Sequence, residues 1–193
     1  ENHKSAIIRP ADVAWYPMRI TYQRELSVKE QLDKIGIESF LPMKKTTIET
    51  PDGAKRANVP AIHNLLFVHE SKSRITELKN SYGPLEPMRY MIRYALNDTM
   101  PNEIITVPDK QMDDFIRVAT APEDKMLFLE NSDYLIKAGR RVRVVEGPFA
   151  GVEGVIKRIQ NNRRVVVQIE NFAAVAIAYV HASQMVYIDE PTV

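Results

Sequence analysis

The chain has 193 residues, of which 45% are hydrophobic and 26% are charged, an ordinary composition for a globular protein with a hydrophobic core. Its 26 lysines and arginines are nearly balanced by 25 aspartates and glutamates, and the resulting net charge of +1 excludes a protein that binds duplexes through a strongly basic surface. The chain contains no cysteine, which excludes disulfides, thiol nucleophiles and thiolate metal sites.

No apolar run approaches the roughly 18 residues that span a bilayer, and the first residues lack the apolar segment of a secretory signal. We therefore expect a cytoplasmic protein without a membrane span. The four histidines are spread along the chain without carboxylates at metal-ligand spacing. No phosphate loop, nucleophile elbow or paired-carboxylate motif is present. The sequence therefore predicts no metal site, no cofactor and no enzymatic activity.

The first predicted element is a strand over residues 15–22, where apolar and aromatic side chains recur at every second position. A short amphipathic helix follows it. Ser27 and Glu30 predict a capping box at the start of this helix, and Gly36 predicts a left-handed cap at its end. The predicted buried stripe of the helix consists of Val28, Leu32 and Ile35.

The next segments predict extended structure. Residues 37–43 form a second predicted strand, and residues 46–56 read as a β-hairpin with a turn at 51–53, Pro-Asp-Gly. Residues 65–68 are continuously apolar, so both faces of that strand should be covered.

A second helix is predicted with Ser73 as its N-cap and with Gly83-Pro84 as its stop. Predicted strands near 88–94 and 104–107 follow, and a third helix opens at Pro108. This order of strands and helices predicts an α+β sandwich, in which helices cover an antiparallel sheet.

The chain is predicted to divide into an α+β domain over residues 13–119, a polar linker over 120–134 and a β-rich domain over 135–189. Five short apolar runs, separated by turns, make up the last domain: residues 142–145, 152–159, 165–169, 175–180 and 185–188. Five strands in so short a segment predict a small closed barrel.

Residues 139–155 resemble a KOW motif. Alternating valines, among them Val144, predict its first strand, and Gly147-Pro148 predicts the turn that follows. Gly151 and Gly154 allow a close backbone approach into the second strand. Because three glycines stand at this spacing between two valine-rich strands, the motif is specific, and it implies an SH3-like barrel.

The preceding part of the chain resembles the N-terminal domain of the NusG family of transcription elongation factors. Trp15-Tyr16 opens the first strand as in that family, residues 40–43, Phe-Leu-Pro-Met, match its strand-ending segment, and residues 66–68, Leu-Phe-Val, match its central strand. One departure is visible. The family usually has an aromatic-Pro-x-Tyr segment before the central strand, and this chain has Ile-His-Asn-Leu at 62–65.

The resemblance implies that the N-terminal domain docks on the clamp helices of the largest subunit of RNA polymerase and antagonises pausing or termination. The residues that it assigns to polymerase binding are Trp15, Arg19, Ile62, Leu65, Phe67, Ser73 and Arg74. Leu65 and Phe67 share one strand face, which we expect to be open in the free protein. The chain is most similar to specialised UpxY-like paralogues that act on long polysaccharide-biosynthesis operons.

Further partners are implied by the same resemblance. The side chains assigned to non-template DNA are Arg24, Lys29, Lys44, Lys45, Lys55 and Arg56, although a solvated charged face explains them equally well. The KOW domain is expected to recruit a ribosomal protein or a termination factor, and the chain is expected to be a monomer. The alternative is a KOW protein that binds RNA or the ribosome without contacting polymerase.

Overall fold

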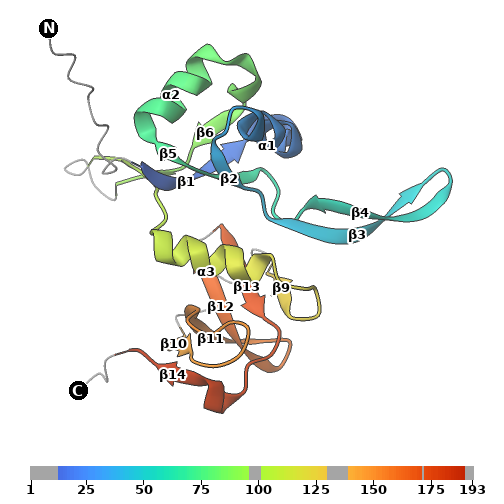
Figure 1. Cartoon of the computed structure of the whole chain (residues 1–193), viewed down its shortest axis with the longest axis vertical. Helices are drawn as coiled ribbons and strands as arrows, with labels where there is room; N and C mark the ends of the chain where they lie inside the picture. The colour runs from blue at the N-terminus through green and yellow to red at the C-terminus, as the bar shows by residue number, and fades with distance from the viewer. Residues whose placement is uncertain (1–12, 96–100, 130–138, 171, 190–193) are drawn as a thin grey trace, which may run out of the picture. The chain divides into compact units, whose positions relative to one another are not determined.

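The computed structural model describes residues 13–95, 101–129, 139–170 and 172–189 (Figure 1). Its internal contacts divide the chain into two compact units. The first unit comprises Glu1–Leu41 and Asn64–Val107, and the second comprises Pro42–His63 and Pro108–Val193.

The first unit is built on a four-stranded antiparallel sheet with the strand order β2-β5-β1-β6. Its strands are β1 (Val13–Ile20), β2 (Glu38–Phe40), β5 (Leu65–Ser71) and β6 (Met88–Tyr90). Two helices, α1 (Glu25–Lys34) and α2 (Lys72–Ser81), lie on the same side of this sheet (Figure 1). Smaller elements are the 3-10 turns Thr21–Gln23 and Gly83–Leu85 and the paired short strands β7 (Ile92–Arg93) and β8 (Glu103–Ile104).

One face of the sheet packs under the helices. The Tyr90 hydroxyl reaches α2, where it lies 3.0 Å from the hydroxyl of Thr76, so Tyr90 is on the helix side. Met18 lies opposite Tyr90 on β6 and opposite Leu66 on β5, and residues directly opposite each other share a face. Met18 and Leu66 are fully buried. Alternate residues of the strands therefore form the core beneath α1 and α2.

The start of α1 differs from the predicted capping box. The helix begins at Glu25, two residues before Ser27, and no side chain caps it. The Glu25 side chain is 3% exposed and accepts a hydrogen bond from the backbone N–H of Asn64 at 2.6 Å. This long-range bond anchors the first turn, which local capping rules do not detect. Gly36 has the predicted left-handed backbone, with φ of +72°.

The N-cap of α2 is Ser71 and not the predicted Ser73. The Ser71 hydroxyl accepts a hydrogen bond from the backbone N–H of Arg74 at 3.3 Å. Both serines precede apolar residues at helical spacing, so the sequence pattern does not separate them. The predicted stop holds, because the helix ends at Ser81, just before Gly83.

The second unit contains a six-stranded antiparallel sheet of the kind found in KOW domains, with the order β14-β10-β11-β12-β13-β9. Its strands are β9 (Met126–Phe128), β10 (Arg141–Val144), β11 (Glu153–Ile159), β12 (Asn162–Ile169), β13 (Ala173–Ile177) and β14 (Met185–Tyr187). The unit also holds helix α3 (Asp109–Ala119) and a separate ribbon of β3 (Met43–Thr50) and β4 (Gly53–Pro60).

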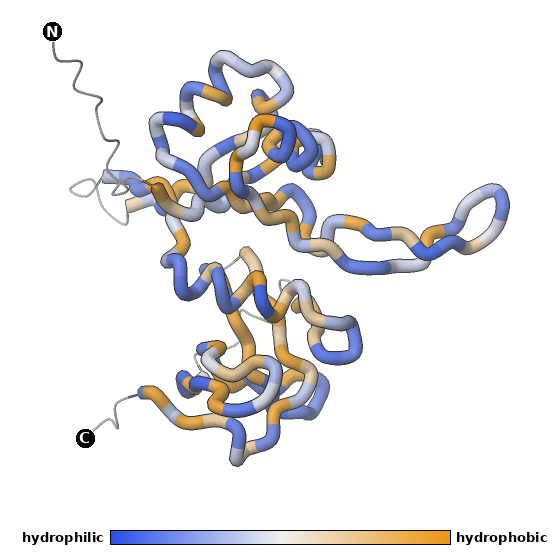
Figure 2. The backbone as a smooth tube through the Cα atoms, in the orientation of Figure 1, coloured by the Kyte–Doolittle hydropathy of each residue, from blue (hydrophilic) through white to orange (hydrophobic). Residues whose placement is uncertain are grey.

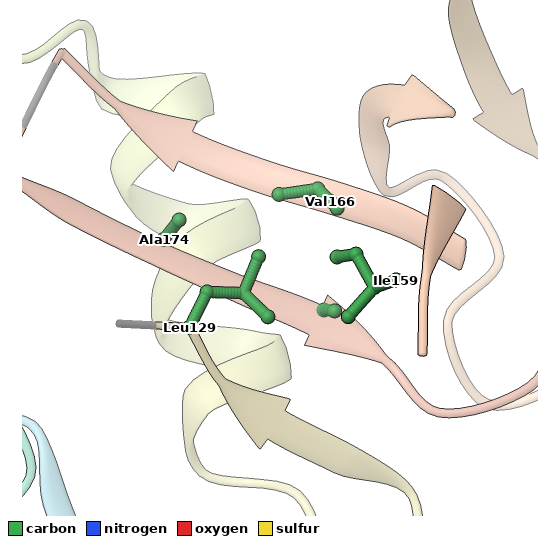
Figure 3. Close-up of a cluster of buried hydrophobic side chains, with 5 residues drawn as sticks. Leu129, Ile159, Val166 and Ala174 are labelled. Atoms are coloured by element: carbon green, nitrogen blue, oxygen red, sulfur yellow. The ribbon is translucent and has the colours of Figure 1, made fainter. Parts of the chain in front are cut away.

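The buried residues of β12 and β13 in the second unit are small or branched. Hydrophobic residues follow one another along β12 and β13 (Figure 2). Leu129, Ile159, Val166, Ala174 and Ala176 form one buried cluster, shown in Figure 3. Small alanines on β13 let the neighbouring branched side chains pack closely against the strand.

Two elements lie differently from the predicted domain boundaries. Helix α3, which the sequence pattern placed in the α+β domain, packs against β12, β13 and β9. Strand β9 falls within the predicted linker and pairs with β13, where Phe128 lies opposite Val175. A three-residue apolar run is too short to be recognised as a strand without its partner. Residues 130–134 of the predicted linker and 135–138 of the predicted barrel lie outside the described residues.

Candidate interaction surfaces

The sheet of the first unit has a second face, on the side away from α1 and α2. Phe67 lies opposite Pro17 and Leu65 lies opposite Arg19, and these positions alternate with the helix-facing ones. Trp15 is on the same face. This face therefore carries the apolar residues Trp15, Pro17, Leu65 and Phe67, together with Phe40 opposite Phe67, and two exposed arginines, Arg19 and the opposing Arg89.

The expectation that Leu65 and Phe67 are open in the free protein is wrong. Their exposed fractions are 3% and 0%, and Trp15 is 4% exposed. Apolar surface gains roughly 25 cal/mol for each Å² removed from water, so a face of this composition is favoured in a covered state. Arg19, in contrast, is exposed, on β1 between β5 and β6.

Sequence reasoning missed a polar cluster beside this face. The rings of Trp15 and His69 are stacked, with centroids 4.7 Å apart and planes inclined by 12°. The His69 Nδ1 atom lies 2.6 Å from a carboxylate oxygen of Glu38 on β2. The two contacts orient the imidazole, and they hold the Trp15 ring in place. Their sequence signal is weak, because Trp15, Glu38 and His69 meet only through the strand register.

The remaining residues assigned to polymerase belong to other elements than the strands of the Leu65 face. Ile62 is half-buried in the loop after β4, in the chain segment of the second unit. Ser73 and Arg74 are in the first turn of α2, where the Arg74 guanidinium pairs with Glu77 at 2.8 Å. The structure therefore brings together Trp15, Arg19, Leu65 and Phe67 on one sheet face, whereas Ser73 and Arg74 belong to a helix on the other side.

Four of the six basic residues assigned to nucleic acid lie on the β3–β4 ribbon. The strand register places Lys45 and Arg56 on one face of the ribbon and Lys44 and Lys55 on the other. Every residue of the Lys45/Arg56 face between Lys45 and Asn58 is exposed, whereas the opposite face includes partly buried residues. The Lys55 ammonium also lies 3.8 Å from Asp52. A two-stranded ribbon of this kind has dimensions that a DNA major groove admits.

The other two basic residues are in the first unit. The Arg24 guanidinium lies 5.7 Å from the centre of the Tyr22 ring, and Lys29 forms an ion pair with Asp33 one turn along α1. Both groups are therefore engaged locally.

The KOW residues have the backbone geometry that their types predict. Val144 is buried at 1% exposure, and Gly147 and Gly151 have positive φ values of +83° and +90°. A Cβ at Gly154 would lie 2.5 Å from the carbonyl oxygen of Val166, so only glycine fits without a backbone shift. This confirms the predicted close approach at Gly154. A Cβ at Gly151 would meet only the Arg117 guanidinium, at 4.0 Å, so Gly151 is required by its positive φ and not by a close approach.

Helix α3 binds the KOW loop through polar side chains, which sequence reasoning did not foresee. Arg117 donates hydrogen bonds to the carbonyl oxygens of Pro148 and Ala150, both at 2.7 Å. Lys110 donates to the carbonyl oxygen of Gly151 at 2.8 Å and to the Asp114 carboxylate. The helix thus satisfies three loop carbonyls, those of Pro148, Ala150 and Gly151.

The described residues hold no group of three or more histidine, cysteine, aspartate or glutamate side chains that suits a metal ion. Among the same residues, every helix is too short or too polar to cross a membrane. These observations concern residues 13–95, 101–129, 139–170 and 172–189.

A mixed helix-and-strand unit followed by a KOW sheet is the organisation of a class of transcription factors. The model of the family described as transcription termination factor NusG matches residues 13–116, more than half of the chain, and the KOW motif model matches residues 138–170. The chain belongs to the NusG family. It is also similar to a solved structure titled "Domain interaction in Thermotoga maritima NusG", with 17% identity over 93% of this chain and 99% of that one and a TM-score of 0.42. No curated protein sequence matches the chain.

Proposed function

We propose that the chain is an elongation and antitermination factor that binds RNA polymerase through the second face of its β1–β5 sheet and suppresses pausing or termination on long polysaccharide-biosynthesis operons. Membership of the NusG family supports the transcriptional role. The observation that carries the assignment is the apolar character of the second face, formed by Trp15, Pro17, Leu65 and Phe67.

A sheet that packs one face on its own helices normally presents a polar second face to water. A second apolar face needs a second cover, and we assign that cover in the transcription complex to the clamp helices of the largest polymerase subunit. Leu65 and Phe67 are buried in the free chain, so binding requires that this face first be exposed. The apparent affinity is then reduced by the fraction of molecules in which the face is open.

The burial of Leu65 changes which substitution tests the proposal. Leu65→Asp would place a carboxylate in a buried position and destabilise the free chain. A loss of polymerase binding in this variant could then not be distinguished from a loss of folding. Arg19 is exposed, lies opposite Leu65 and tolerates substitution without loss of core. Arg19→Glu should reduce binding of purified core RNA polymerase by about tenfold, because a charge reversal at the rim of an interface repels the partner's acidic groups.

The matched control is Lys34→Glu, the same charge reversal at the exposed end of α1, on the helix side of the unit. It should leave polymerase binding within about twofold of wild type, since its site is remote from the assigned face. Failure of the unmodified chain to bind polymerase would favour the alternative, a KOW protein that acts on RNA or the ribosome. Equal loss in both variants would mean that net charge, and not the Leu65 face, determines binding.

We propose that the β3–β4 ribbon contacts the non-template DNA strand beside the polymerase, through Lys45 and Arg56 on its open face. Its basic side chains are supported by the exposed hydroxyl of Thr47 and the exposed amide of Asn58 on the same face. Such groups hydrogen-bond to phosphate oxygens and position a protein on the backbone without reading its sequence.

A further inference from the structure

The β11–β12 hairpin of the second unit is strongly basic. Between Glu153 and Glu170 the sequence contains no acidic residue, and four basic residues stand near the turn. These residues are Lys157, Arg158, Arg163 and Arg164. The strand register makes them two directly opposed pairs, Lys157 with Arg164 and Arg158 with Arg163.

Directly opposed like charges destabilise a pair of strands, whereas opposite charges stabilise it. Two such pairs in succession therefore cost free energy in the isolated hairpin. Lys157 is 6% exposed, and its ammonium donates to the side-chain oxygen of Gln168 at 2.7 Å. Burial also lowers the pKa of Lys157. In the Lys157–Arg164 pair, the Lys157 ammonium thus has a neutral hydrogen-bond partner.

The second pair, Arg158 and Arg163 beside the turn, differs from the first. Arg158 and Arg163 are both exposed, and neither guanidinium contacts a carboxylate within the part of the chain that the structure describes. No carboxylate of the described residues therefore compensates their repulsion. An anion placed between the two guanidinium groups would remove it.

The turn holds this pair at a fixed spacing. Gln160 and Asn161 have φ values of +49° and +64°, the two successive left-handed residues of a tight two-residue hairpin. Such a turn matches the twist of the strands and limits their relative movement. Opposed residues have Cβ atoms about 4.5–5.5 Å apart, so the two guanidinium groups can meet one phosphate or two neighbouring ones.

We propose that the tip of the β11–β12 hairpin binds the phosphodiester backbone of a nucleic acid, with Arg158 and Arg163 as the phosphate ligands. Guanidinium groups form bidentate hydrogen bonds with phosphate. The turn residues Gln160, Asn161 and Asn162 add neutral amide donors and no negative charge. This site is distinct from the apolar sheet face and from the β3–β4 ribbon, and it does not depend on polymerase binding.

The test uses the full chain and the double variant Arg158→Gln/Arg163→Gln. Binding of a fluorescein-labelled oligouridine RNA and of the matching oligothymidine DNA is followed by fluorescence anisotropy at several salt concentrations. The variant should bind about tenfold more weakly at low salt, because it loses two charge-assisted contacts. For single strands, the slope of log K against log salt should fall in magnitude by about 1.4, that is, about 0.7 for each lost phosphate contact.

The matched control is Arg140→Gln/Arg141→Gln, which removes the same charge from the residues at the start of β10. This control should change the affinity for either oligonucleotide by less than about twofold and the salt slope by less than about 0.5. Thermal unfolding of the hairpin variant should be unchanged or shifted upward, because opposed like charges are removed.

The two nucleic acids distinguish the source of the phosphate. Tighter binding of the RNA identifies the transcript, tighter binding of the DNA identifies the displaced strand, and equal binding supports recognition of the backbone that both share. The proposal is overturned if the hairpin variant retains wild-type affinity, if the control loses as much, or if a polyglutamate peptide competes as well as the oligonucleotides.

Discussion

The carboxylate of Asp114 on α3 accepts a hydrogen bond from the backbone N–H of Glu153, the first residue of β11, at 3.0 Å. Asp114 is 5% exposed, and its two oxygens also accept from the Lys110 ammonium at 2.6 and 2.5 Å. Lys110 in turn donates to the carbonyl oxygen of Gly151. The Asp114–Lys110 pair therefore joins α3 to the KOW motif at two points, the last loop residue Gly151 and the first strand residue Glu153.

Asp114→Ala should destabilise the second unit by about 1–3 kcal/mol, because it leaves the N–H of Glu153 without its acceptor in a buried place. Hydrogen exchange of the Glu153 amide measures this directly and should become faster. The control is Asp113→Ala, the adjacent and exposed aspartate. Unchanged exchange at Glu153 in Asp114→Ala would show that the helix is not anchored there.

Gly154→Ala should destabilise the second unit by roughly 1–3 kcal/mol, because the new methyl group would lie 2.5 Å from the Val166 carbonyl oxygen. Urea unfolding, followed by the amide signals of β11 and β12, gives the free-energy change. Gly83→Ala is the comparison, since a Cβ there meets no atom within 4 Å. Equal stability of the two variants would refute the close approach of β11 and β12.

The Arg143 guanidinium, which donates to Glu153 at 2.9 and 2.6 Å, holds the pKa of the Glu153 carboxyl below its ordinary value of 4.5. A carboxyl with a lower pKa in the folded chain stabilises it above the unfolded pKa, and this contribution is lost as the pH falls through the folded pKa. Stability should therefore decline as the pH drops below about 4.5.

Carboxyl NMR titration tests the cause of this shift. Arg143→Gln should raise the Glu153 pKa toward its ordinary value, whereas Arg140→Gln should leave it in place, since Arg140 does not contribute to the shift. A Glu153 pKa at or above 4.5 in the unmodified chain would contradict the assignment.

Most of the fold follows from local patterns in the sequence. The five strands of the KOW region were predictable because β-branched runs alternate with turn residues, and the glycines at 147 and 151 have local conformational reasons, since both have positive φ values. The start of α3 was equally predictable from Pro108-Asp109. These features depend on residues that are close in sequence.

The features that could not be predicted depend on contacts between distant residues. Glu25 is buried because it meets Asn64, and β9 exists because β13 offers it an edge. Ser71 and Ser73 are equally good N-caps by type, so geometry alone separates them. The burial of Leu65 could not be predicted, because it depends on tertiary structure. The alternation of side chains along a strand shows which face Leu65 is on, but it does not show whether that face is covered.

The two faces of the β3–β4 ribbon provide an internal control for DNA binding. Lys45→Gln/Arg56→Gln should weaken binding of a polymerase complex to forked DNA, whereas Lys44→Gln/Lys55→Gln, with the same net charge, should have the smaller effect. The reason is that the first pair lies on the fully exposed face and Lys55 is beside Asp52. Equal effects of the two double variants would mean that the ribbon acts by net charge alone.

Single-round transcription by purified core polymerase, on a long template that contains pause and termination sites, measures the proposed antitermination activity directly. The unmodified chain should increase the fraction of full-length transcript. Arg19→Glu should lose this effect, and Lys34→Glu should retain it, because only the former alters the sheet face of Leu65 and Phe67. No change in pausing or read-through with the unmodified chain, at concentrations that saturate polymerase binding, would contradict the account.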